Sequence, residues 1–126
     1  MKFGEVSMNA PDVSVIIPAY DRPEELRRKL VSLTRQTLPV RRFEVIVVDD
    51  GSPSDVFAKS WEVIDEMENL TLIRNSPGRG VSVARNVGAR QAKGDLLVFL
   101  DVDCMAHPAL LEKHLEAQRE RPVAVC

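Results

Sequence analysis

The sequence predicts an α/β fold in which a mostly parallel sheet is flanked by helices. Short runs rich in Val, Ile and Leu recur along the chain, and segments with the apolar spacing of a helix separate them. The runs carry apolar residues at consecutive positions, which is typical of strands buried on both faces. Strands that alternate with helices favour parallel pairing through right-handed crossovers. Ligands of such a sheet bind beyond the carboxyl ends of its strands.

The first half of the chain begins with a strand at residues 13–17, a β-branched run that a proline ends. A helix is predicted next, at residues 21–36. Asp21 and Glu24 have the spacing of a capping box at its start, and leucines at helical spacing give it one apolar face. A second strand is predicted at residues 44–48, before a turn rich in Asp, Gly, Ser and Pro.

The second half continues the same alternation. A glycine-rich break separates a short third strand from a helix, and the apolar run that follows ends in acidic residues. We interpret residues 1–12 as a tail and residues 13–126 as one domain. The domain is expected to be incomplete at its carboxyl end, because the chain stops as a fifth strand begins. The remaining elements are predicted as helices at residues 54–68, 81–93 and 108–119 and as strands at residues 70–73, 95–100 and 123–125.

Composition excludes several classes of function. The chain has 126 residues, with 17 basic and 19 acidic side chains, so neither a nucleic acid nor an acidic membrane surface is predicted as a partner. Its two cysteines form no CxxC pair, which indicates neither a disulfide framework nor a zinc site. The sequence shows no apolar stretch of the length of a signal peptide or a membrane span. We expect a cytoplasmic protein, and a membrane-associated full-length form stays open.

Two carboxylates, Asp101 and Asp103, follow the apolar run at residues 96–100. Residues two apart on an extended strand face opposite sides, so both side chains reach one ligand only if the chain turns there. Carboxylates are ligands that Mg²⁺ and Mn²⁺ prefer, with substrate phosphates completing the shell. The pattern indicates a divalent cation held against a phosphate, although such a triplet alone is more often a solvated acidic turn.

Three ordered stretches together resemble the family-2 glycosyltransferases, which have the GT-A nucleotide-sugar-binding fold. The resemblance extends over residues 13–125 and is carried by VSVIIPAYDRPEELRRKLVSLTRQT, EVIVVDDGSPSD and GRGVSVARNVGARQAKGDLLVFLDVDC. It implies the amino-terminal, donor-binding portion of an enzyme that transfers sugar from a nucleotide-diphospho-sugar, with UDP-sugars favoured, to an unknown acceptor hydroxyl. The family's general base lies downstream of residue 126, so this portion would bind a nucleotide without transferring sugar.

The resemblance also implies a nucleotide site. Asp50 would contact the base or the ribose, while Asp49 caps the turn after the second strand. Arg85 matches the Ala-Arg-Asn of the family, beside the nucleotide, and a surface salt bridge is its plainer interpretation. Tyr20 would be a stacking surface or an ordinary core aromatic. The nucleotide-binding residues predicted in this way are Pro18, Ala19, Tyr20, Asp50, Arg85 and Asp101.

For the metal, the resemblance implies a direct contact from Asp103 and a ribose or water-mediated metal contact from Asp101, with Mg²⁺ or Mn²⁺ as the cation. The cation would neutralise charge on the departing nucleoside diphosphate. The helix after the glycine-rich break offers free N–H groups near which a diphosphate could sit. Cys104 is expected to pack, and His107 and His114 are expected to be structural.

Three other functions fit the pattern less well. A phospho-acceptor receiver domain places its acidic pair after the first strand and a lysine after the fifth, whereas here the pair follows the second strand. A nucleotidyltransferase needs a glycine-rich basic loop after the first strand, where residues 18–22 read PAYDR. A non-catalytic nucleotide-binding module stays open because the sheet is incomplete. The same incompleteness leaves sheet edges uncovered and predicts self-association.

Overall fold

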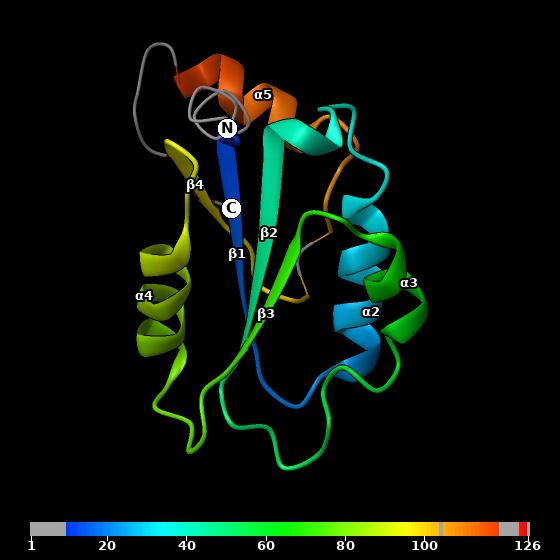
Figure 1. Ribbon diagram of the computed structural model, residues 1–126, viewed down its shortest axis with the longest axis vertical. Helices are drawn as coiled ribbons and strands as arrows, with labels where there is room; N and C mark the ends of the chain where they lie inside the picture. Colours follow the sequence, from blue (N-terminus) through cyan, green and yellow to red (C-terminus); the bar gives the residue numbers. More distant parts are fainter. Residues whose placement is uncertain (1–9, 104, 119–123, 126) are drawn as a thin grey trace, which may run out of the picture.

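The chain forms a parallel sheet in the order β3-β2-β1-β4-β5 (Figure 1). The computed structural model describes residues 10–103, 105–118 and 124–125. Every pair of neighbouring strands runs parallel, which confirms the predicted α/β class. The chain moves outward from β1 to β3 and then returns to place β4 on the other side of β1, so the strand order reverses between β1 and β4. The strands are β1 Val13–Ala19, β2 Phe43–Asp49, β3 Leu70–Arg74, β4 Leu96–Phe99 and β5 Ala124–Val125.

Helices cover both faces of the sheet, with α2 and α3 on one side and α4 on the other (Figure 1). Side chains alternate along each strand, so Val15 packs with Leu30 of α2 in the main core, while Val48 packs with Ala84 of α4 in a smaller cluster. No helix in the described part of the chain has the length and apolar character to cross a bilayer. The helices are α2 Pro23–Leu33, α3 Trp61–Glu66, α4 Val81–Gln91 and α5 Leu110–Gln118, with a 3-10 turn, η1, at Val40–Arg42.

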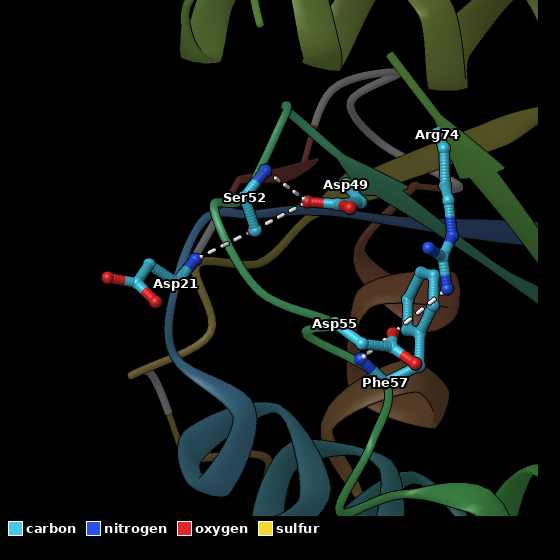
Figure 2. A network of polar contacts seen from close by, with 6 residues as sticks. All are labelled: Asp21, Asp49, Ser52, Asp55, Phe57 and Arg74. Carbon is cyan, nitrogen blue, oxygen red and sulfur yellow. Dashed lines mark hydrogen bonds and ion pairs between the residues drawn. The ribbon is translucent and has the colours of Figure 1, made fainter. Parts of the chain in front are cut away.

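The helix predicted at residues 54–68 is wrong in its first half, because α3 spans only Trp61–Glu66 and turns precede it. The Asp55 carboxylate explains the difference. Its Oδ1 accepts a hydrogen bond from the Phe57 N–H at 3.0 Å and pairs with the Arg74 guanidinium at 2.9 Å (Figure 2). The guanidinium also lies 4.9 Å from the centre of the Phe57 ring. A local turn of this kind competes with a helix for the same backbone groups.

The capping box predicted from Asp21 and Glu24 does not form at the start of α2. Asp21 has a φ of 52°, in the left-handed region, and its backbone N–H donates to the Ser52 hydroxyl at 2.9 Å (Figure 2). Glu24 accepts a hydrogen bond from Arg27 at 2.6 Å instead, and this bond lowers the pKa of Glu24. The start of α2 is therefore held against the turn after β2 and carries no side-chain cap.

The helix predicted to reach residue 36 ends at Leu33, and Gln36 joins it to the start of α5. The Gln36 amide donates to the carbonyl of His107 at 2.7 Å and accepts from the N–H of Leu111 at 3.1 Å. Leu111 is fully buried in the main core, so α5 packs on the same side as α2. The predictions for residues 1–9, Cys104, residue 119 and the start of the last strand at Val123 lie outside the described residues.

Candidate functional site

The carboxyl ends of β1, β2 and β4 bring the predicted site segments to one edge of the sheet. The N–H of Asp50 donates to the carbonyl of Ala19 at 2.9 Å, which joins the turn after β2 to the end of β1. The N–H of Leu100 donates to the carbonyl of Ile16 at 3.0 Å, so the acidic residues leave the sheet beside β1. This edge includes the point where the strand order reverses, the place where open α/β sheets bind ligands.

A cavity of about 250 Å³ at this edge gathers four of the residues predicted for the nucleotide. Tyr20 is 57% exposed, so it offers a free surface and is not a core aromatic. Val81, the first residue of α4, is about half exposed and was not predicted as part of the site. The cavity is lined by Pro18, Ala19, Tyr20, Asp50 and Val81.

Asp49 holds the turn after β2, as predicted. Its Oδ1 accepts hydrogen bonds from both the backbone N–H and the hydroxyl of Ser52, at 3.1 and 2.6 Å (Figure 2). The Ser52 hydroxyl in turn accepts the N–H of Asp21. The Asp49 side chain therefore holds together the turn after β2 and, through Ser52, the loop before α2.

Asp50 lies at the edge of the cavity and is 9% exposed. Its Oδ1 accepts the backbone N–H of Arg79 and its Oδ2 accepts that of Gly80, each at 2.8 Å. Gly80 has a φ of 103°, a backbone conformation suited to glycine, and is followed directly by α4. The predicted glycine-rich break thus leads into a helix whose first N–H groups have no partner within the helix itself.

Arg85 of α4 pairs with Asp101, the first carboxylate after β4, with 3.1 Å between nitrogen and oxygen. Their side chains are 39% and 54% exposed. An exposed pair of this kind contributes about 0–1 kcal/mol, so a ligand can separate it at little cost. Two residues predicted for the nucleotide thus lie side by side, and Arg85 also forms the surface salt bridge that was its plainer interpretation.

Asp101 and Asp103 are both exposed in the turn after β4. Asp103 lines a second cavity of about 170 Å³, beside α2, together with the buried Lys29. Within the described ranges, no three His, Cys, Asp or Glu side chains gather as a complete metal site. A hard cation that takes its remaining ligands from phosphate and water needs only one or two carboxylates. The oxygen donors of Asp101 and Asp103 are of the kind that Mg²⁺ or Mn²⁺ prefers, with Asp101 placed against Arg85 of α4 and Asp103 placed in the cavity beside α2.

The histidines lie outside this arrangement of residues. His107 Nδ1 accepts the N–H of Ala109 at 3.0 Å, a local contact just before α5. His114 is half-buried on α5. The structural roles of the two histidines stay predictions.

A family model described as Glycosyl transferase family 2 matches residues 14–126. The chain belongs to glycosyltransferase family 2. Glycosyltransferase AglE of Haloferax volcanii is 38% identical over 103 residues, which cover 82% of this chain and 34% of AglE. This family-2 chain therefore spans about a third of the length of that curated relative.

Solved structures share the fold of this family-2 chain. TarS of S. aureus in complex with UDP has a TM-score of 0.77 and 30% identity, covering 86% of this chain and 32% of TarS, and TarS is also solved with UDP-GlcNAc. The mannosyltransferase PcManGT of Pyrobaculum calidifontis, in complex with GDP-Man and Mn²⁺, has a TM-score of 0.74 and 29% identity, covering 86% of this chain and 31% of PcManGT. The predicted family and GT-A fold are thereby confirmed.

Proposed function

We propose that this chain binds a nucleotide-diphospho-sugar with a divalent cation, and that the whole enzyme transfers the sugar to an acceptor hydroxyl. One observation carries the proposal: the cavity beside Tyr20 and the Arg85–Asp101 pair occupy the same edge of the sheet, at the carboxyl ends of the strands. The ligands of TarS and PcManGT, which are UDP, UDP-GlcNAc and GDP-Man, support a donor of this class. UDP-sugars remain the favoured donors.

The nucleoside would occupy the cavity. Pro18 and Ala19, both buried at the end of β1, form its floor, and the exposed Tyr20 ring offers a surface on which a base can stack. Each oxygen of Asp50 keeps a second lone pair, which can accept a hydrogen bond from the base or the ribose. This arrangement gives the nucleoside one aromatic wall and one acceptor.

The diphosphate would lie between the cavity and the turn after β4. The Arg85 guanidinium can exchange its exposed partner, Asp101, for a phosphate. Asp101 and Asp103 would hold the cation. When bound, the cation neutralises charge that develops on the leaving nucleoside diphosphate. Transfer also requires a general base for the acceptor hydroxyl, and we assign that role to no described residue.

The proposal predicts that Tyr20→Ala weakens UDP binding without destabilising the fold. Loss of stacking on one base costs about 1–3 kcal/mol, or about 5-fold to 150-fold in Kd. Because the ring is largely exposed, the free energy of unfolding should stay almost unchanged. Isothermal titration calorimetry of UDP in the presence of Mn²⁺ measures the first quantity, and urea unfolding measures the second.

The matched control is Trp61→Ala, because Trp61 is an exposed aromatic on α3, outside the cavity lining. This variant should bind UDP like the wild-type chain. Equal Kd values for Tyr20→Ala and the wild type would show that the nucleoside does not stack on Tyr20.

A further inference from the structure

The wall of the nucleoside cavity is built by two segments that are far apart in the sequence. Asp50 follows β2, whereas Arg79 and Gly80 precede α4. One carboxylate joins them, because its two oxygens accept the two consecutive backbone N–H groups at 2.8 Å each. With the side chain largely buried, these are charge-assisted bonds shielded from water.

Two glycines allow the segments to approach this closely. A Cβ on Gly51 would collide with the backbone nitrogen of Gly78, and a Cβ on Gly78 would collide with the carbonyl oxygen of Asp50. The N–H of Asn75 adds a hydrogen bond to the carbonyl of Asp49 at 2.8 Å. The backbone of the two segments is thus in direct contact, and the Asp50 carboxylate fixes their alignment.

The residue after Gly80 is Val81, which both begins α4 and lines the nucleoside cavity. Arg85 lies one turn further along the same helix, where it reaches Asp101. The position of the 78–80 loop therefore sets the far wall of the cavity and the start of the helix that carries the guanidinium. Negative charge before the first turn of a helix is also favourable for the helix dipole.

We propose that Asp50 is a positioning residue, which holds the 78–80 loop so that Val81 and the amino end of α4 are in place before the nucleotide arrives. This role is separate from the base or ribose contact and rests on the proposed donor binding. It differs from that contact in its consequence. Replacing a residue that contacts the base changes the relative affinities for different bases. Replacing a residue that only positions the cavity wall lowers the affinity for every nucleotide by the same factor.

The test uses Asp50→Asn, which keeps the shape but offers one acceptor to two N–H donors. Amide hydrogen exchange, followed by NMR without nucleotide, should show Arg79 and Gly80 protected in the wild type and exchanging at least about tenfold faster in the variant. UDP and CDP, titrated with Mn²⁺, should both bind about 5-fold to 150-fold more weakly, since a buried donor is left without a partner.

Two further variants keep the result interpretable. Gly78→Ala pushes the loop away from the Asp50 carbonyl while leaving the carboxylate intact. It should therefore speed exchange at the Arg79 and Gly80 amides and weaken UDP and CDP binding by an equal factor. Asp55→Asn removes a carboxylate from the loop after β2, but one that contacts Phe57 and Arg74 and lies outside the cavity lining. This variant should change neither the amide exchange nor the nucleotide affinity.

The proposal would be overturned if Asp50→Asn left the Arg79 and Gly80 amides protected, or if Gly78→Ala, which keeps the Asp50 carboxylate, bound UDP and CDP as tightly as the wild type or altered the ratio of their Kd values. A wild-type chain that bound no nucleotide would overturn the proposed donor binding. Exchange at the two amides would then decide alone whether Asp50 holds the loop.

Discussion

Replacing Asp103 with Asn is expected to remove the dependence of UDP binding on Mn²⁺. A neutral amide is a much weaker ligand for a hard cation than a carboxylate, and the variant leaves one carboxylate, Asp101, in the turn. Changing the partners of metal ligands costs about 10-fold to 100-fold in metal affinity, so the loss of a ligand itself should cost at least about 100-fold. Calorimetric titration of UDP at several Mn²⁺ concentrations measures the apparent affinity for the cation.

Asp95→Asn is the matched control for this prediction. Asp95 is exposed like Asp103, but it lies just before the amino end of β4, at the opposite end of the same strand. Its replacement removes the same charge from the chain and should leave the Mn²⁺ dependence intact. If Asp103→Asn kept the Mn²⁺ dependence of the wild type, the metal role of Asp103 would be refuted.

Replacing Leu30 with Ala should lower the free energy of unfolding by about 2–5 kcal/mol, the usual range for a leucine truncated in a packed core. Leu30 is fully buried on the face of α2 that covers the sheet. The truncation removes apolar contacts and leaves a space that its neighbours fill only in part. Chemical denaturation in urea measures the change, with a shift of the midpoint at constant slope as the sign of a pure stability effect.

Val40→Ala serves as the comparison, because Val40 is half exposed in η1 and should change stability by less than about 0.5 kcal/mol. A loss below about 1 kcal/mol for Leu30→Ala would mean that α2 does not pack on the sheet as described. The same result would also count against the described position of the cavity, because the end of β1 lines the cavity and the chain continues from there into α2.

The strands were predictable because buried parallel strands carry an uninterrupted apolar run. The second strand was expected at residues 44–48 and spans Phe43–Asp49, and the fourth was expected at residues 95–100 and spans Leu96–Phe99. Helix boundaries were less predictable where a polar side chain pairs with a residue distant in the sequence. Asp55 forms a turn with Arg74 in place of a helix start, and no pattern within residues 54–68 indicates that partner.

The candidate site was predicted as a set of residue types but not as a set of contacts. The ends of parallel strands meet at one edge, so the proximity of Pro18, Ala19 and Asp50 followed from the element order. Val81 and the bonds from Asp50 to the 78–80 loop did not follow, because their partners are about 30 residues away in the sequence. Gly78 and Gly80 were the available signal, since paired glycines before a helix often mark a close approach of backbone.

The most direct test of the account is a calorimetric titration of UDP into the wild-type chain, with and without Mn²⁺, alongside GDP and TDP. We expect UDP to bind in the presence of Mn²⁺, more tightly than GDP or TDP, and to lose most of its affinity when the cation is removed. Failure of all three nucleotides to bind would contradict the donor site proposed here, and UDP binding that is indifferent to Mn²⁺ would contradict the role of Asp101 and Asp103.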